Sequence, residues 1–264
     1  MKIPVYSLSG EVKSHLEVAR TFSEKVRRDL IARAVIAEQS SRIQPYGPNP
    51  LAGKRTSAHY HGRRRVRHAM MNVEMARAPR IHGQGQLNMT ARFAPHTIKG
   101  RKAFPPKVEK VWEKSINKKE RRKALLSAIS ATADKELVAL RGHRLNGIKH
   151  LPLVVEDKMG EMKKAKEIVG VLEKLGLGEE LERTKEKKIR AGRGKMRGRK
   201  YKRKKGPLII IKDEKGIEKG AKNISGIDVA VVKNLSVELL APGTHPGRLC
   251  IWTQSALEEM EKAS

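Results

Sequence analysis

The basic segment from Arg42 to Lys102 places the strongest constraint on how this chain can fold. It is rich in Arg, Lys, Gly, Pro and His and contains one acidic residue, Glu74. No helical or strand periodicity of apolar residues runs through it, so it can bury little and should not form a compact core of its own. A long segment of this kind inside a compact domain is usually functional or disordered. We therefore expect an extended loop with a polyanionic partner.

The positive charge of the chain is concentrated in two segments. The formal net charge is +30 over 264 residues. Residues 42–104 hold thirteen Lys or Arg and one acid, and residues 190–205 hold ten Lys or Arg and no acid. Such clusters are typical of nucleic-acid-binding proteins, because self-repulsion on this scale needs a counter-charge. The simpler alternative is a solvated charge run, and for residues 190–205 a flexible solubilising loop.

Cysteine use and hydropathy favour a cytoplasmic protein. The single cysteine, Cys250, cannot form an internal disulfide, which fits a reducing compartment. Its apolar neighbours Leu249 and Ile251 indicate a small core residue in a strand rather than a catalytic thiol. No apolar run approaches the roughly 18 residues of a membrane span. The amino-terminal residues also lack the apolar core of a signal peptide.

The residues before the basic segment predict a strand and a helix. Residues 3–8 alternate enough for a short strand. Residues 21–24, Thr-Phe-Ser-Glu, form a capping-box pattern that predicts a helix start. The helix should fade near Gln39, before a run of prolines. Its apolar face is expected to comprise Phe22, Val26, Leu30 and Ala34.

Beyond the basic segment we expect helices first and then an α/β pattern. Helical sequence resumes near residues 108–112, and a stronger helix should run from Lys118 to about Leu140, with Asn117 as its cap and Gly142 as its stop. Apolar runs predict strands at 153–156, 208–211, 227–232 and 249–252. Between and after them we expect a helix that ends at Gly176 and a helix from Thr253 to about Lys262.

Continuous apolar strands suit a sheet that is buried on both faces, and helices between strands suggest right-handed crossovers. The predicted fold class is therefore α/β: a three-layer α/β/α domain with a mostly parallel sheet. Residues 1–41 and 105–264 should form this domain. Residues 42–104 should be an extended RNA-binding loop inserted in it, and residues 190–205 a second basic loop.

No motif in the sequence predicts catalysis, a cofactor or a metal site. The glycines of Gly47–Thr56 are spaced by five residues where a Walker loop needs four, and no strand precedes them. Asp157 and Asp213 follow strands, where α/β enzymes often place ligands, but turn residues explain them equally well. Five loop histidines lack nearby Cys or carboxylate partners for zinc, and contact with phosphate or bases is the expected role: His59, His61, His68, His82 and His96.

The basic segments favour binding to folded RNA. Arginine bonds phosphate in two places and stacks on bases, and the loop glycines allow close backbone approach. Aromatic residues make up 3% of the chain, too few for base-stacking platforms, so backbone and shape readout is expected. The candidate RNA-binding residues are Arg42, Lys54, Arg55, Arg63, Arg64, Arg65, Arg67, Arg77, Arg80, Arg92, Lys99, Arg101, Lys102, Arg193, Arg197, Arg199 and Lys200.

Four stretches carry a resemblance to a known family. They are ARAPRI at 76–81, TIKGRKAFPPK at 97–107, NKKERRKALLSAISATADKELVALRGHRL at 117–145, and LAPGTHPGRLCIWTQSALEEM at 240–260. With them, nearly the whole chain resembles the universal large-subunit ribosomal protein four family in its archaeal form. The chain lacks the long carboxyl-terminal extension of eukaryotic members, and its tract at 190–205 differs from the shorter bacterial form.

This resemblance implies a structural constituent of the large ribosomal subunit that binds large-subunit rRNA, assists assembly and contacts neighbouring ribosomal proteins. It also implies that the long loop helps to form the wall of the polypeptide exit tunnel, next to the nascent peptide. By position, the loop tip is expected within Arg63–Arg80, with residues 97–102 holding the returning strand on RNA. No membrane or DNA partner is implied. The residues expected nearest the tunnel are Met70, Met71, Met75, Arg77 and Arg80.

Two alternative functions fit the basic composition. One is an RNA-modifying enzyme on a Rossmann-like core, for which residues 9–11 after the first strand make a poor cofactor loop. The other is a chromatin-like DNA binder, which should bind duplex DNA and folded RNA with comparable affinity.

Overall fold

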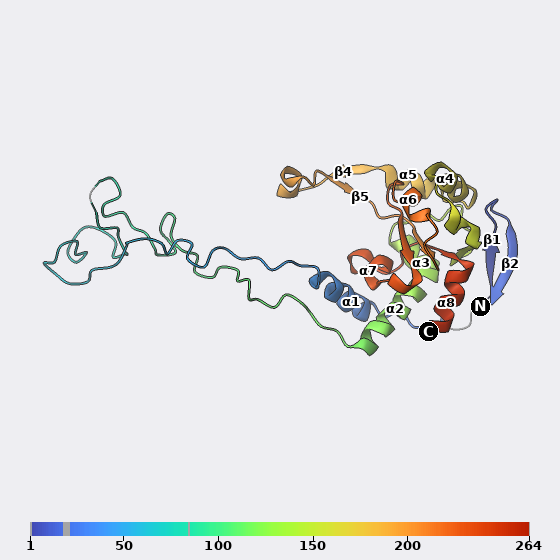
Figure 1. Cartoon of the computed structure of the whole chain (residues 1–264), viewed down its shortest axis with the longest axis horizontal. Helices are drawn as coiled ribbons and strands as arrows, with labels where there is room; N and C mark the ends of the chain where they lie inside the picture. The colour runs from blue at the N-terminus through green and yellow to red at the C-terminus, as the bar shows by residue number, and fades with distance from the viewer. Residues whose placement is uncertain (1, 18–21, 84, 264) are drawn as a thin grey trace. The chain divides into compact units, whose positions relative to one another are not determined.

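A mostly parallel six-stranded sheet organises this mixed α/β protein (Figure 1). The computed structural model describes residues 2–17, 22–83 and 85–263. The chain divides into two compact units: unit 1 comprises residues 1–42 and 113–264, and unit 2 comprises residues 43–112. No helix among the described residues is long and apolar enough to cross a membrane.

The sheet of unit 1 has the strand order β2-β1-β3-β8-β6-β7. Only β2 is antiparallel to its neighbour; the other pairs are parallel. The edge strand β2 was not predicted, because its side chains are exposed or half-buried and carry little apolar alternation. The strands are β1 (Lys2–Tyr6), β2 (Val12–Glu17), β3 (Leu153–Val155), β6 (Leu208–Ile211), β7 (Asp228–Val231) and β8 (Cys250–Thr253).

Both faces of this sheet are covered by apolar side chains. Along β6, Leu208 and Ile210 belong to one buried cluster, whereas Ile209 and Ile211 belong to another. Burial on both faces explains why the central strands are continuous apolar runs. The first cluster includes residues of α1 (Arg28–Ser40), α2 (Lys118–Ala133), α7 (Val237–Leu240) and α8 (Gln254–Ala263). The second includes residues of α3 (Lys135–Leu140), α4 (Ala165–Lys174), α5 (Gly178–Lys185) and α6 (Ile217–Ala221).

The first helix begins later than the sequence predicts. Helix α1 starts at Arg28, and the backbone N–H of Arg27 donates to Ser127 Oγ at 2.6 Å. Phe22 and Val26 precede the helix but still pack against the first apolar cluster, so the apolar pattern extends beyond the helix itself. Thr21 of the expected capping box lies outside the described residues.

The long helix predicted after the basic segment is two helices. Asp134 separates α2 from α3, and its carboxylate accepts hydrogen bonds from Glu136 N at 2.9 Å and Leu137 N at 3.4 Å. Asn117 occupies the N-cap position of α2, but its side chain makes no capping hydrogen bond. Asp134 therefore caps α3 where propensity alone favours continuation.

The helix expected near residues 108–112 is absent. Val108 and Val111 are mostly exposed, so no apolar face is buried there to stabilise a helix. Trp112 instead stacks on Tyr46, with ring centroids 5.3 Å apart. This contact joins the two ends of unit 2.

The predicted helix stops at Gly142 and Gly176 are confirmed. Both residues follow a helix end with positive φ, +96° and +83°. The described residues of unit 1 also form four short 3₁₀ helices: η1 (Asp157–Glu161), η2 (Arg193–Arg197), η3 (Val232–Asn234) and η4 (Pro242–Thr244).

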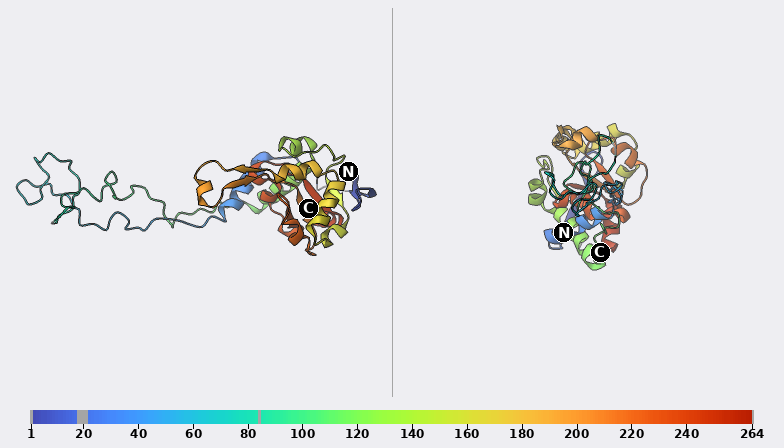
Figure 2. Two further views of the ribbon diagram at one scale, coloured as in Figure 1. Left: turned by 90° about the horizontal axis from the view of Figure 1, so that it is seen from above. Right: turned by 90° about the vertical axis from the view of Figure 1, so that its left-hand side faces the viewer.

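Residues expected as a basic loop at 190–205 lie largely in a hairpin. Strands β4 (Lys187–Ile189) and β5 (Tyr201–Arg203) pair antiparallel, with η2 in the connection between them (Figure 2). Every residue of both strands is exposed. The strands were not predicted because neither face has the apolar alternation that marks a half-buried strand.

Candidate nucleic-acid interface

Backbone hydrogen bonds, rather than an apolar core, shape unit 2. Isolated antiparallel bridges join His59 to Arg80 and Arg80 to Ala91, so three passes of the chain lie side by side. His59 N donates to Arg80 O at 3.3 Å, and Arg80 N donates to His59 O at 3.1 Å. Among the described residues of this unit, the buried apolar side chains are Met70, Ala78 and Ala94.

Most of the predicted RNA-binding side chains in unit 2 are exposed. No ion pair forms within the described part of residues 43–112, so these cations have no internal counter-charge. The arrangement leaves them available to an external polyanion. The exposed members are Lys54, Arg55, Arg63, Arg64, Arg65, Arg67, Arg77, Lys99 and Lys102.

Three predicted contact residues help to shape unit 2. Arg80 donates through Nη1 to Met89 O at 2.8 Å and through Nη2 to Ala76 O at 3.0 Å. Arg92 donates to the carbonyl oxygen of Ile98 at 2.6 Å. The Arg101 guanidinium lies 5.7 Å from the centre of the Phe93 ring. These arginines are half-buried and hold turns of the backbone.

Arg42 differs from the other candidates because it is already paired. Its Nη2 lies 2.7 Å from a carboxylate oxygen of Glu238, within unit 1. Half or more of its side chain remains in solvent, so the pair contributes little to stability.

The β4–β5 hairpin presents a second group of exposed cations. Lys187 Nζ and Lys200 Nζ lie 5.9 Å and 5.5 Å from the centre of the Tyr201 ring. Arg190 Nε donates to Arg199 O at 3.0 Å, which links the two sides of the hairpin. The predicted contact residues here, Arg193, Arg197, Arg199 and Lys200, are all exposed.

Unit 1 also holds a cationic cavity that the sequence analysis missed. It measures about 630 Å³, and its lining includes Arg28, Arg141, Arg183 and Lys205. Arg28 makes no ion pair with any described residue, and Arg141 donates to backbone carbonyl oxygens, including that of Pro242 at 2.8 Å. Burial, together with the neighbouring positive charges, lowers the pKa of Arg141 to about 10. Four distant segments supply these residues, so no local motif reveals the cavity.

A buried carboxylate positions one of these arginines. Glu180 has no exposed surface, and it accepts from Arg183 Nε at 2.7 Å and from Arg183 Nη2 at 2.6 Å. His143 Nδ1 lies 2.6 Å from the same carboxylate, and Arg144 N donates to it at 3.1 Å. Burial acts to raise the pKa of Glu180, but the bonds from Arg183 and His143 outweigh it and hold that pKa at about 2.

Of the two acids that could have supported an enzyme, Asp157 has a structural role. Asp157 Oδ1 accepts from Ser255 N at 2.9 Å and Ser255 Oγ at 2.6 Å, near the start of α8. Asp213 and Asp157 line a cavity of about 220 Å³, below the roughly 300 Å³ at which ligand pockets usually begin. Cys250 is buried, as predicted, and burial raises the pKa of its thiol to about 12.

Residues 16–263 match the family model of the ribosomal protein L4/L1 family. The chain belongs to this family. Among curated members of the ribosomal protein L4/L1 family, it is 45% identical over 260 residues to the large ribosomal subunit protein uL4 of Methanosphaera stadtmanae, covering 98% of this chain and 96% of that protein. It is 47% identical over 259 residues to the protein of the same name from Archaeoglobus fulgidus, covering 98% and 97%. The expected family, in its archaeal form, is confirmed.

Proposed function

We propose that this chain is a structural RNA-binding protein of the large ribosomal subunit, without catalysis. The observation that carries the proposal is the set of exposed cations in unit 2 that lack an internal counter-charge. Family membership over residues 16–263 supports it independently. The partners are large-subunit rRNA and neighbouring ribosomal proteins; neither a membrane nor DNA is a partner. The protein acts in the ribosome and contributes to assembly of the subunit.

The proposed mechanism is electrostatic and geometric. Lys and Arg side chains replace counterions on packed RNA, and phosphate contacts set the register of the RNA segments. Residues 42–104 act as the extended RNA-binding loop, and residues 190–205 supply a second contact. The globular part is a three-layer α/β/α platform, which is supported by apolar clusters on both faces of the sheet. The arginines that brace unit 2 keep its exposed cations in place.

The tip of the loop, within Arg63–Arg80, borders the polypeptide exit tunnel in this proposal. Met71 and Met75 have accessible side chains that can face the nascent peptide, whereas the side chain of Met70 is buried and can only support them. Composition supports this. Residues 69–79 contain two charged residues, Glu74 and Arg77, whereas residues 63–67 contain four arginines. Met75 is 41% exposed, so apolar surface is accessible there. A surface with few cations suits a passing peptide better than phosphate.

Crosslinking from residues 77–80 in native ribosomal particles, with sequencing of the attached RNA, tests the proposal. We expect crosslinks to large-subunit RNA at the exit tunnel. Crosslinks to the same RNA far from the tunnel would contradict the placement of the loop tip at the tunnel but would still support the ribosomal role. Crosslinks scattered over messenger or transfer RNA would contradict both.

The cationic cavity of unit 1 is a further proposed contact with rRNA phosphate. Arg28 is exposed at its edge and has no counter-charge among the described residues. We expect Arg28→Ala to weaken binding to large-subunit RNA and to reduce the salt slope by roughly 1. Arg33→Ala is the matched control, because Arg33 lies on the same helix and pairs with Glu120 at 3.2 Å. Equal losses in the two variants would contradict a phosphate site at the cavity.

A further inference from the structure

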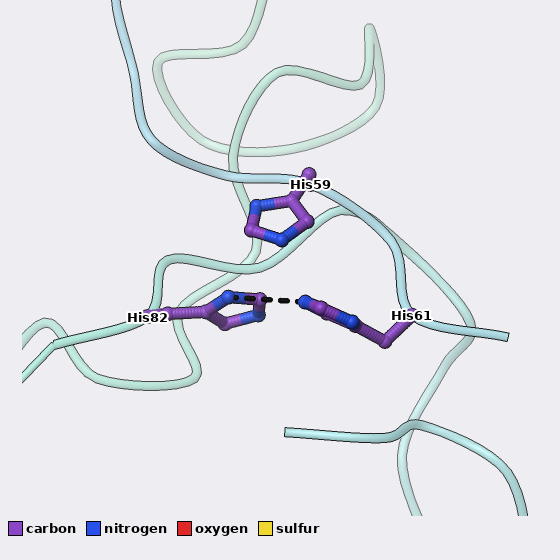
Figure 3. A group of neighbouring side chains, drawn as sticks. All are labelled: His59, His61 and His82. Carbon is purple, nitrogen blue, oxygen red and sulfur yellow. Dashed lines mark hydrogen bonds between the residues drawn. The ribbon is translucent and has the colours of Figure 1, made fainter. Parts of the chain in front are cut away.

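Three histidines from two separate stretches of unit 2 converge on one point. His59, His61 and His82 each direct a ring nitrogen toward the others, and these nitrogens all lie within 4.8 Å of one another (Figure 3). His61 Nε2 and His82 Nδ1 are 3.3 Å apart. A fourth ring, His68, stacks on His82 with centroids 4.5 Å apart.

We propose that His59, His61 and His82 form a binding site for a zinc-class divalent transition-metal ion. Zinc bonds to imidazole nitrogen at about 2.0–2.1 Å, so two ligand nitrogens on a tetrahedral edge lie roughly 3.3–3.4 Å apart. The separation of 3.3 Å between His61 Nε2 and His82 Nδ1 matches this edge. Sequence analysis predicted no zinc site because Cys and carboxylate partners are absent, but three histidines and one open position make a known zinc set.

The tautomer of His59 suits metal binding. Its Nδ1 lies 3.0 Å from the backbone carbonyl oxygen of Ser57. A carbonyl oxygen only accepts, so Nδ1 carries the proton and Nε2 keeps a free lone pair. Metal-bound histidines usually hold their second nitrogen in this way, since the bond fixes both tautomer and ring orientation.

The backbone brings the three ligands together before any ion binds. His59 and His61 are two residues apart, which places them on one side of an extended segment. The antiparallel bridge between His59 and Arg80 holds the segment that carries His82 beside the segment that carries His59 and His61. Met70 N donates to His61 O at 3.3 Å, and Met70 is buried. A bound ion would therefore fasten the outgoing part of the loop to the returning part.

The chemistry of the ligands selects the class of ion. Neutral imidazole suits zinc, copper, nickel and iron, whereas magnesium and calcium require oxygen ligands. Three protein ligands leave the fourth position for water or an anion.

The test uses the full-length chain without an affinity tag, titrated with Co²⁺ and then with Zn²⁺. Tetrahedral Co²⁺ absorbs in the visible range, and displacement by Zn²⁺ measures zinc affinity. We expect one ion per chain and at least about tenfold weaker binding in His61→Ala and in His82→Ala. His96→Ala is the matched control, because His96 is an exposed histidine of the same unit outside the cluster. It should bind as tightly as the unaltered chain.

Two results would overturn the site. One is the absence of a tetrahedral Co²⁺ band in the unaltered chain. The other is equal affinity in all three variants, which would mean adventitious binding to scattered histidines. Thermal unfolding of unit 1 serves as the folding check, because its apolar clusters contain no residue of the site. The ion should also slow proteolysis between residues 59 and 82, an effect that a chelator should reverse. The test does not depend on the ribosomal role.

Discussion

At the scale of single residues, Gly176 shows how a helix stop also serves packing. It has φ of +83°, and a Cβ built there would lie 2.3 Å from the carbonyl oxygen of Gly147. The sequence predicted the helix end from glycine chemistry alone. The close approach to Gly147 depends on a segment distant in the chain, so no local pattern could reveal it.

Replacing Gly176 should therefore destabilise the chain more than an ordinary glycine substitution. We expect Gly176→Ala to lower the free energy of unfolding by at least about 2 kcal/mol, from backbone strain and overlap. Gly170→Ala is the control, since Gly170 lies within α4 and its Cβ would meet nothing within 4 Å. It should stabilise the helix by roughly 0.5–1 kcal/mol. Urea unfolding measures both, and equal midpoints would contradict the argument.

The buried carboxylate Glu180 gives a prediction about pH. Its pKa falls from 4.5 to about 2 in the fold, so it stabilises the native state above pH 4.5. That stability should be lost as the pH falls from 4.5 toward 2. Glu180→Gln should flatten this dependence and, because it leaves Arg183 without its buried counter-charge, cost about 3–5 kcal/mol at pH 7.

Urea unfolding at a series of pH values measures this effect. Glu17→Gln is the control, because Glu17 pairs with Lys2 while both side chains are more than 70% exposed. A loss below about 1 kcal/mol is expected there. If the free energy of unfolding of Glu180→Gln fell with pH below 4.5 as steeply as that of the unaltered chain, other groups would be responsible for the pH dependence.

At the scale of elements, local sequence patterns predicted the strands correctly where both faces of the sheet are buried. The central strands and the ends of α3 and α4 match their predictions to within a few residues. Prediction from local pattern failed where contacts between distant segments determine whether an element forms and where it begins. Helix α1 starts late because Ser127 binds the backbone of Arg27, and the expected helix at 108–112 has no surface to pack on. The β4–β5 hairpin was missed because its strands are fully exposed and have no apolar face that a sequence pattern could reveal.

Because the hairpin is exposed, its proposed role in RNA binding can be tested separately from the stability of the fold. Changing Arg193, Arg197, Arg199 and Lys200 together to Ser should leave the free energy of unfolding almost unchanged, since such surface changes usually lie within about 0.5 kcal/mol each. The slope of log affinity for large-subunit RNA against log salt should fall by roughly 0.7–0.9 for each phosphate that the variant no longer neutralises.

A variant with the same charge change elsewhere is the control for the hairpin. Four exposed lysines of unit 1 already pair with acids, and they can be changed to Ser together: Lys2, Lys13, Lys215 and Lys222. Binding measured by filter retention at several salt concentrations compares the two variants. Equal slopes would show that only net charge matters, and that the hairpin makes no specific contact.

At the scale of the whole molecule, the apolar clusters lie in unit 1 and do not extend into unit 2. Neither apolar cluster of unit 1 includes a residue of 43–112. Lys114 N donates to Ser40 Oγ at 2.9 Å, so the chain on either side of unit 2 is held together within unit 1. Unit 1 therefore has its own core and a closed junction.

Replacing residues 43–112 with a short Gly/Ser linker should leave unit 1 folded. The unfolding midpoint in urea should be nearly that of the full chain, because both apolar clusters of unit 1 stay complete. Affinity for large-subunit RNA and its salt slope should both drop, since the variant loses the fourteen Lys and Arg residues of unit 2, which make no ion pair among the described residues. Cooperative unfolding that disappears in this variant would contradict the independence of unit 1.

The sequence by itself determined where the positive charge lies, which strands form the centre of the sheet, and the family. These properties depend on composition, apolar runs and motifs, which are local. Only the tertiary structure decided which arginines are free and which brace the backbone, where four cations surround a cavity, and that His82 meets His59 and His61. These features join residues far apart in the chain, and long-range packing and hydrogen bonding set them.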